Sequence, residues 1–247
     1  MVEQPAKRVD SRDHARHVVS TGLDDRVAAV LWDMDGTLVD TEPYWIDVEY
    51  ALVAEHGGTW SREHALNLVG SDLLVSGAYI REHGGVDLEP EEIVDRLLDG
   101  VIARIREEVP WRPGAVELLA GLNAAGVPCA LVTMSYERFV APVLEALPAG
   151  SFAAVVTGDG VAIGKPHPEP YLTAAGLLGV DPAACVAIED SNTGAKSAEA
   201  AGCTVLVVPN HVPVLEGERR VFRDSLVDVD VAQLGELVEQ VTRPSGS

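Results

Sequence analysis

The sequence predicts an α/β fold in which a parallel sheet carries helices on both faces and a block of helices follows the first strand. Three observations support this prediction. An apolar run at residues 27–32 has the composition of a buried strand. From residue 44 to about residue 109 only helical periodicity is found, and from residue 110 short apolar runs alternate with helical segments. Strands that alternate with helices form parallel sheets covered on both faces.

The individual elements follow from the same periodicities. Pro43 suits the first turn of a helix, and the insert should hold about four helices, with ends at the two His-Gly-Gly segments 56–58 and 83–85. Apolar residues recur at helical spacing in the insert, at Ile46, Tyr50 and Val53 and again at Ile93, Leu97, Val101 and Ile105. Further strands are expected at residues 129–133, 152–157, 185–189 and 203–208. Helices are expected at residues 114–126, 137–147, 168–178, 193–201 and 231–241, and Pro142 should strain the second of these.

Three parts of the chain are therefore expected. Residues 1–26 form a flexible extension ahead of the first strand, and residues 243–247 should fray. Residues 27–42 and 110–242 form the sheet-containing core, and residues 43–109 form a helical cap inserted into it.

Composition and charge narrow the possible partners. The chain has 247 residues, is 47% hydrophobic, and carries a formal net charge of −21, which argues against nucleic acids and anionic membranes as partners. No apolar run is long enough to span a membrane, and residues 1–25 lack the apolar core of a signal peptide. The three cysteines each begin an apolar run, as expected of buried thiols in a reducing cytoplasm. We expect a cytoplasmic protein and, without any sequence signal for assembly, a monomer.

The most informative motif follows the first strand. Asp33 and Asp35 are two residues apart, and Gly36 comes directly after them. If the strand geometry persists through Met34, both carboxylates point to the same side. Paired carboxylates at the carboxyl end of a strand suit a hard cation and an oxyanionic substrate. The alternative is an acidic turn without chemical function.

Polar residues also follow the next two strands. Thr133 and Ser135 offer hydroxyl groups for a phosphate oxygen, although Ser135 could equally cap the helix expected at residue 137. Lys165 is one of only three lysines and lies in a loop of sequence Gly-Lys-Pro-His-Pro. Its ammonium group could neutralise a phosphate, or it could be an ordinary solvated lysine. His167, in the same loop, is interpreted as a loop residue rather than an acid or base.

Two adjacent acids end the strand expected at residues 185–189. Glu189 and Asp190 are costly to bury unless a partner is present, and a divalent metal ion is the natural one. Helix capping by Asp190 or Ser191 is the alternative. Each motif alone is a weak signal, but four in order, each directly after a predicted strand, are a strong one.

With these four motifs the sequence resembles the haloacid dehalogenase superfamily over nearly all of the chain beyond residue 26. The resemblance implies a Rossmann-like core with a helical cap, and Mg²⁺-dependent phosphoryl transfer through an aspartyl-phosphate. It makes Asp33 the nucleophile and Asp35 the general acid and base. It implies that the phosphoryl group is bound by Thr133, Ser135, Lys165 and backbone N–H groups near Gly36. It also implies that Mg²⁺ is bound by Asp33, the Asp35 carbonyl and Asp190, and that Glu189 supports these metal ligands.

The resemblance also narrows the reaction. Dehalogenases of this fold generally lack the second aspartate of the first motif, and phosphonate hydrolysis uses a cap lysine that residues 44–109 do not contain. The group most similar to the sequence is the β-phosphoglucomutase-like group, which mixes mutases with sugar-phosphate and glycolate-phosphate phosphatases. The mutases have a cap histidine where this chain has Trp45. We therefore expect a phosphatase acting on a small phosphorylated metabolite, with a phosphosugar mutase or a catalytically idle binding protein as alternatives.

The substrate itself has no sharp signature in the sequence. Trp45 either packs in the cap or forms an apolar wall of the site. Residues 69–72 are the best candidate for a substrate-contacting loop in the cap, although Ser71 or Asp72 could simply cap a helix.

Overall fold

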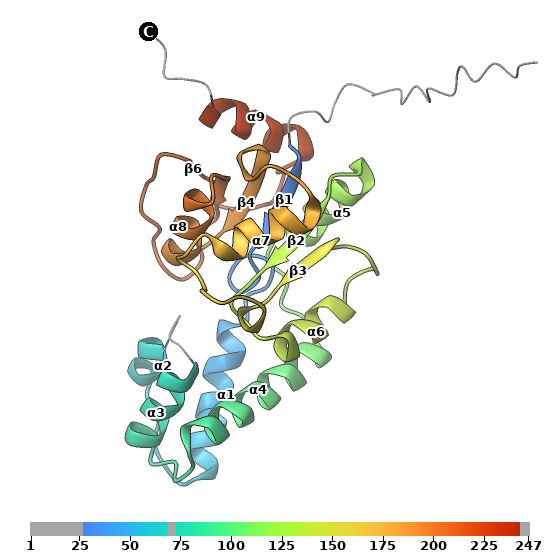
Figure 1. Ribbon diagram of the computed structural model, residues 1–247. Coiled ribbons are helices and arrows are strands. Elements are labelled where there is room, and N and C mark those ends of the chain that lie inside the picture. The colour runs from blue at the N-terminus through green and yellow to red at the C-terminus, as the bar shows by residue number, and fades with distance from the viewer. Residues whose placement is uncertain (1–26, 69–72, 243–247) are drawn as a thin grey trace, which may run out of the picture.

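The computed structural model describes residues 27–68 and 73–242, and within them six parallel strands form one sheet (Figure 1). The order β3-β2-β1-β4-β5-β6 puts β1 at the centre, paired with β2 on one side and β4 on the other. This confirms the predicted α/β fold. The strands are β1 (Ala29–Trp32), β2 (Cys129–Val132), β3 (Ala154–Val156), β4 (Cys185–Glu189), β5 (Thr204–Val207) and β6 (Arg220–Phe222).

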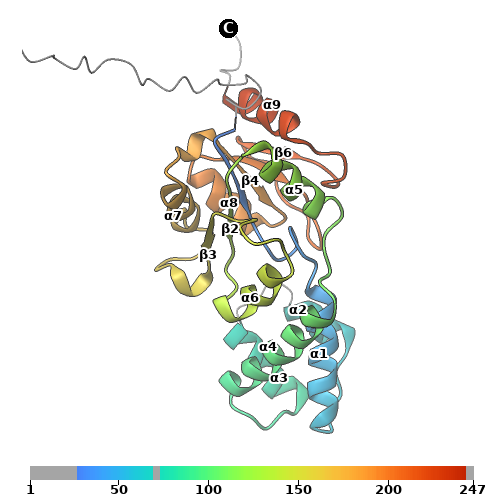
Figure 2. The same ribbon diagram turned by 90° about the vertical axis from the view of Figure 1, so that its right-hand side faces the viewer.

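Helices cover both faces of the sheet because side chains alternate along each strand. Ala29 and Leu31 of β1 point into one apolar cluster, and Val30 and Trp32 point into the other. Helices α7 (Glu169–Leu178) and α8 (Asn192–Ala200) cover the first face, and α5 (Ala115–Ala125) and α9 (Val231–Thr242) cover the second (Figure 2). All four residues of β1 are buried, as the continuous apolar run predicted.

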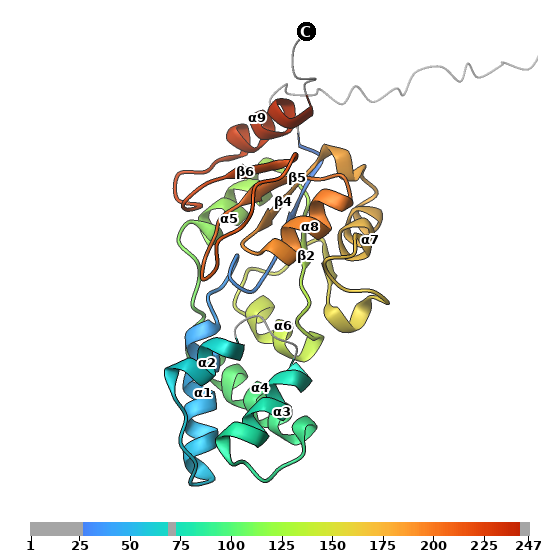
Figure 3. The ribbon, with the colours of Figure 1, turned by 90° about the vertical axis from the view of Figure 1, so that its left-hand side faces the viewer.

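The part of the chain between β1 and α5 contains four helices in its described residues. These are α1 (Glu42–Glu55), α2 (Arg62–Leu68), α3 (Leu73–Gly84) and α4 (Pro90–Glu107). They gather at one end of the molecule, beyond the carboxyl end of β1, with α6 (Glu137–Glu145) between them and the sheet (Figures 1 and 3). The four apolar positions predicted for α4 are all buried. In α1 the buried face is Val48, Glu49, Leu52 and Val53, whereas Tyr50 is 37% exposed.

The two chain segments that join this helical block to the sheet are paired with each other. Val39 and Trp111 form an antiparallel bridge. The Asp40 N–H donates to the Pro110 carbonyl at 2.8 Å, and the Arg112 N–H donates to the Leu38 carbonyl at 2.9 Å. Both linkers therefore enter the block side by side. The division into a core, residues 27–42 and 110–242, and a cap, residues 43–109, remains our proposal.

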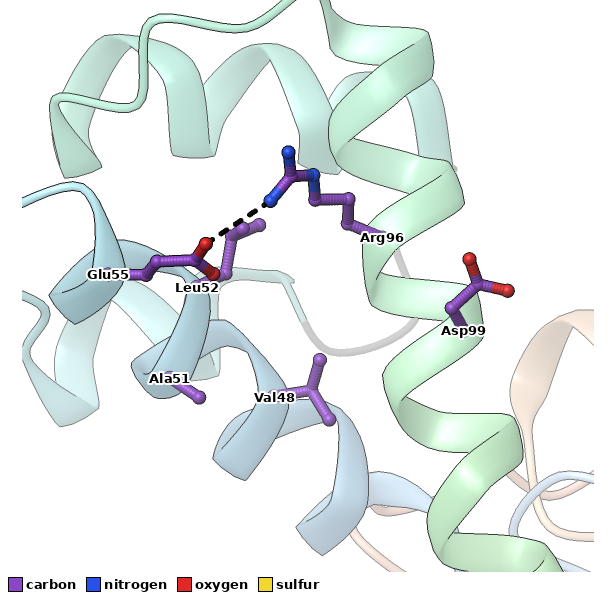
Figure 4. Close-up of a pocket in the computed structure, with 6 residues that line it drawn as sticks. All are labelled: Val48, Ala51, Leu52, Glu55, Arg96 and Asp99. Carbon is purple, nitrogen blue, oxygen red and sulfur yellow. Dashed lines mark hydrogen bonds and ion pairs between the residues drawn. The ribbon is translucent and has the colours of Figure 1, made fainter.

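A shallow groove runs between α1 and α4 on the helical block (Figure 4). Its volume is about 380 Å³. The Arg96 guanidinium crosses it and lies 3.4 Å from the Glu55 carboxylate. The other lining residues are Val48, Ala51, Leu52 and Asp99. The groove is formed by cap helices alone and does not include the polar residues at the strand ends.

Two elements, one strand and one helix, differ from the prediction. The sixth strand, β6, was missed because it is only three residues long, partly buried, and preceded by charged residues. A contact distant in sequence stabilises it: the Arg220 guanidinium donates to the Glu199 carboxylate of α8 at 2.7 Å. Helix α6 continues through Pro142, which is buried rather than disruptive.

Cys129, Cys185 and Cys203 are buried free thiols, as expected from their positions in apolar runs. Among the described residues, no helix is long and apolar enough to cross a membrane. The predictions for the extension at residues 1–26, the cap loop at residues 69–72 and the tail at residues 243–247 lie outside the described residues.

Glu49 makes the stability of the helical block sensitive to pH. Burial raises the pKa of Glu49 to about 7, opposed by a hydrogen bond from the Trp60 indole N–H at 3.1 Å. The unfolded chain titrates near 4.5. Between these values the folded state binds more protons, so the free energy of unfolding falls as the pH rises from about 4.5 to about 7.

We predict that in Glu49→Gln the free energy of unfolding no longer falls over this pH range, because glutamine accepts the same hydrogen bond without ionising. The variant should unfold like the wild type at pH 5. At pH 8 it should be more stable by about 1–2 kcal/mol, after allowance for solvent screening. Urea unfolding at both pH values measures this, with the exposed Glu107→Gln as control. A stability difference that does not change with pH would contradict the assignment.

Candidate active site

The site lies at the carboxyl ends of β1, β2 and β4, which are neighbours in the sheet. The chain order along the sheet reverses next to β1, and ligands of open α/β sheets bind where the strand order reverses. Asp33 follows β1, Thr133 follows β2, and Glu189 ends β4. The fold thus brings together side chains about 50 to 150 residues apart in sequence, as predicted from their positions after strands.

Lys165 is at the centre of the site. Its Nζ lies 2.7 Å from Asp33 Oδ1 and 2.7 Å from Glu189 Oε1. The lysine side chain is only 5% exposed, so it is not the solvated lysine that the sequence left as an alternative. Burial alone would lower its pKa, but the carboxylates of Asp33 and Glu189 more than offset burial and raise the pKa above its usual range. Lys165 is therefore a permanent cation in the site.

Glu189 is fully buried and has three polar partners. Besides Lys165, the Tyr171 hydroxyl donates to Oε1 at 2.6 Å and the Ser191 hydroxyl lies 3.2 Å from Oε2. Tyr171, on α7, was not identified from the sequence, because a tyrosine in an amphipathic helix reads as a core residue. Ser191 also accepts the Gly194 N–H at 3.0 Å, so helix capping does occur here, by Ser191 rather than Asp190.

Within the site, the Asp190 carboxylate makes no hydrogen bond or ion pair with the residues that the structure describes. Asp190 is 9% exposed and packs on Gly36, where a Cβ would collide with its carboxylate and where φ is +86°. Burial raises the pKa of Asp190 to about 8, and the negative charge of Asp33 adds to the effect. Burial likewise raises the pKa of Asp33 to about 7, with Glu189 adding to it and Lys165 opposing it.

The carboxylates of this site fit a divalent cation. Oxygens of Asp33, Glu189 and Asp190 all lie within 4.8 Å of one another. Lys165 supplies one positive charge against these three, and the raised pKa values of Asp33 and Asp190 reflect the remaining electrostatic cost. Hard oxygen ligands are those that Mg²⁺ and Ca²⁺ prefer. The donor set therefore suits such an ion.

Asp35 has a different environment from Asp33. Strand β1 ends at Trp32, the Asp33 N–H still donates to the Ile188 carbonyl at 3.0 Å, and the two carboxylates have separate partners. The Thr41 hydroxyl donates to Asp35 Oδ1 at 2.9 Å, and the Ser135 hydroxyl donates to Oδ2 at 2.6 Å. Burial raises the pKa of Asp35, while these hydrogen bonds oppose the rise.

The hydroxyl groups of Thr133 and Ser135, in the segment after β2, both lie next to the Asp35 carboxylate. Thr133 Oγ1 lies 3.5 Å from Asp35 Oδ2 and accepts the Ser135 N–H at 3.0 Å. Helix α6 begins at Glu137 after Tyr136, so Ser135 does not cap it. Thr41, at the start of the helical block, was not identified from the sequence, because a threonine before a helix reads as a capping residue. It makes no side-chain cap bond here.

His167 and Trp45 lie outside this group. His167 has a side chain that is 47% exposed, and its Nδ1 accepts the Glu169 N–H at 3.3 Å. Trp45 packs on Phe139 of α6, with ring centroids 5.5 Å apart. The first observation agrees with the loop position expected for His167, and the second shows that Trp45, for which the sequence left cap packing and a wall of the site as alternatives, contacts α6.

Known proteins resemble this chain over most of its length. It is 33% identical to hexitol phosphatase B of Escherichia coli K12, covering 86% of this chain and 95% of that protein. It is 34% identical to a phosphoglycolate phosphatase of Salmonella choleraesuis, covering 72% of this chain and 79% of that protein. The solved structure of CbbY from Rhodobacter sphaeroides in complex with phosphate matches 84% of this chain and 99% of that one, with a TM-score of 0.74 and 30% identity.

A β-phosphoglucomutase from Clostridium difficile shares the fold, with a TM-score of 0.71 at 22% identity. The family model of haloacid dehalogenase-like hydrolases matches residues 27–202, which include every strand-end residue of the site described above. The chain belongs to the haloacid dehalogenase-like hydrolase family.

Proposed function

We propose that this protein is a Mg²⁺-dependent phosphatase that hydrolyses a phosphate monoester of a small metabolite through an aspartyl-phosphate on Asp33. The observation that carries the proposal is the Lys165 ammonium, 2.7 Å from both Asp33 and Glu189, beside the unpaired carboxylate of Asp190. This arrangement combines a nucleophile, a fixed cation and oxygen ligands for a metal ion in one buried site.

In the first half of the reaction, Asp33 attacks the phosphorus atom and the ester P–O bond breaks. Lys165 contacts the attacking carboxylate directly, and it neutralises phosphoryl charge from a buried position. Thr133 offers its hydroxyl at the end of β2. Asp35 gives its proton to the leaving oxygen, which becomes the free alcohol.

In the second half, water attacks the phosphoryl group on Asp33 and inorganic phosphate leaves. Asp35, now ionised, takes the proton from this water and returns to its starting state. Asp33, Asp190 and the Asp35 carbonyl would hold Mg²⁺, with Glu189 fixed nearby by Lys165 and Tyr171. The metal ion would offset repulsion between the carboxylates and the anionic phosphoryl group.

The metabolite, the compartment and the assembly state are part of the same proposal. The relatives act, by their names, on phosphates of hexitols and of glycolate, which supports a small phosphorylated substrate. The net charge of −21 disfavours nucleic acid and anionic membranes. Three buried free thiols are typical of a reducing cytoplasm. We propose a cytoplasmic monomer.

Hydrolysis is favoured over phosphosugar mutation by Trp45. An indole ring packed on Phe139 cannot relay protons between substrate hydroxyls. Incubation with β-glucose 1-phosphate, with and without a bisphosphate activator, separates the two reactions. Inorganic phosphate or no product agrees with a phosphatase, whereas accumulation of glucose 6-phosphate would favour the mutase.

We predict that Asp33→Asn abolishes turnover and leaves the fold intact. An amide does not form the acyl-phosphate, so phosphate release from 4-nitrophenyl phosphate should fall by about a thousandfold or more. The exposed Asp87→Asn is the matched control and should keep wild-type activity. Near wild-type kcat in Asp33→Asn, with no deamidation by mass spectrometry, would exclude Asp33 as the nucleophile.

We predict that EDTA removes activity, that Mg²⁺ restores it, and that Asp190→Asn raises the Mg²⁺ concentration for half-saturation by about tenfold or more. The substitution removes a charged oxygen ligand while preserving the shape of the side chain. Metal titrations of both proteins, followed by activity and by thermal stability, measure the change. The same half-saturation in both proteins would remove Asp190 from the metal ligands.

We predict that the loss in Asp35→Asn depends on the leaving group. With enzyme in excess of substrate, the rate of alcohol release from an alkyl phosphate such as glucitol 6-phosphate should fall by about a hundredfold, because its alkoxide is a poor leaving group. For 4-nitrophenyl phosphate the first step should lose much less, since nitrophenolate leaves without a proton. Equal losses on both substrates would show that Asp35 acts by positioning instead of by proton transfer.

A further inference from the structure

The segment that follows β5 makes contacts with both linkers of the helical block. His211 Nε2 lies 2.7 Å from Asp40 Oδ1, and the Asn210 side-chain amide donates to the same oxygen at 3.3 Å. The Arg112 guanidinium donates to Asn210 Oδ1 at 2.8 Å. Asp40 lies in the first linker and Arg112 in the second. We call these four residues, Asp40, Arg112, Asn210 and His211, the clasp.

The clasp is directly connected to one carboxylate of the active site. Asp40 is followed by Thr41, whose hydroxyl donates to Asp35 Oδ1 at 2.9 Å. The backbone of Asp40 is itself fixed, because its N–H donates to the Pro110 carbonyl at 2.8 Å. Fixing the Asp40 side chain therefore fixes the place from which Thr41 reaches Asp35.

The Asp35 carboxylate accepts hydrogen bonds from two segments that are distant in sequence. Thr41 approaches from the linker and Ser135 from the segment after β2, at 2.9 Å and 2.6 Å. If the linker shifts, the Asp35 carboxylate keeps Ser135 and loses Thr41. Asp33 does not depend on the linker in this way, because its partner is Lys165. A displacement of about 1 Å is enough to reduce a catalytic rate by orders of magnitude.

The contact between His211 and Asp40 contributes little to folding. The two side chains are 40% and 30% exposed, and a polar contact this exposed is worth about 1 kcal/mol or less. Their loss should leave the protein folded, so a kinetic effect would have to arise from a changed active site.

We propose that His211 and Asn210 are positioning residues that act through Asp40 and Thr41 to hold Asp35 where it exchanges protons with the substrate and water. The proposal rests on the proposed function, which makes Asp35 the general acid and base. It predicts that loss of the clasp slows the release of an alkyl alcohol, which needs a proton from Asp35. The release of nitrophenolate, which leaves without a proton, should change much less.

The test compares His211→Ala, His211→Gln and Asp35→Asn with the wild type. Val212→Ala is the control, since Val212 is the next residue of the same loop and is 44% exposed. Each protein, saturated with Mg²⁺ and in excess of substrate, is mixed with glucitol 6-phosphate or 4-nitrophenyl phosphate. The maximal rate of alcohol release and the half-saturating enzyme concentration are measured separately.

For His211→Ala we expect the maximal rate on glucitol 6-phosphate to fall by about tenfold, with half-saturation changed less than about twofold. On 4-nitrophenyl phosphate the rate should fall by less than about threefold. His211→Gln, which keeps a donor for Asp40, should recover at least about half of the lost rate, and Val212→Ala should match the wild type.

The outcomes separate this inference from the proposed function. A leaving-group-dependent loss in Asp35→Asn, together with equal losses or no loss in His211→Ala, would overturn the positioning role and leave the function standing. Equal losses on both substrates in Asp35→Asn would overturn proton transfer by Asp35 and, with it, the inference. A wild-type protein that hydrolyses neither substrate would overturn both.

Discussion

The contact between the Lys165 ammonium and the carboxylates of Asp33 and Glu189 is the interaction on which the site depends. Two buried carboxylates this close would repel each other without a cation between them, and a buried lysine would be equally unfavourable alone. The loop that carries Lys165 is fixed at both ends. The Lys165 N–H lies 3.2 Å from Met134 Sδ, and the Ser197 hydroxyl donates to the His167 carbonyl at 2.6 Å. These contacts fix the loop backbone, and the hydrogen bonds to Asp33 and Glu189 fix the Lys165 ammonium.

Glycine at two positions lets the carboxylates reach that arrangement. A Cβ on Gly36 would collide with the Asp190 carboxylate, and a Cβ on Gly194 would collide with that of Glu189. These close approaches bring the acids against the backbone, away from water, where their charge is expensive. Lys165 offsets part of this charge, and the remainder makes a divalent cation a natural further component of the site.

Much of this site is predictable from sequence because the carboxyl ends of neighbouring parallel strands meet at one edge. Asp33, Thr133 and Glu189 each follow or end a central strand, so their proximity needs only the correct topology. Tyr171 and Thr41 were missed because their roles depend on how a helix and a linker pack, which local patterns do not encode. The same limit explains the missed strand β6, which depends on Arg220 reaching α8.

The separation of Asp33 and Asp35 into different environments gives two identical side chains different chemistry. Asp33 faces the Lys165 ammonium, which favours the ionised carboxylate that attacks phosphorus and opposes the effect of burial and of Glu189. Asp35 faces neutral hydroxyl groups from Thr41 and Ser135, which can accept or donate as its proton comes and goes. One of these hydroxyls, that of Thr41, belongs to the linker. A shift of the linker would therefore change the position of the Asp35 carboxylate. The rate of proton transfer is then set partly by residues such as His211 that never touch the substrate.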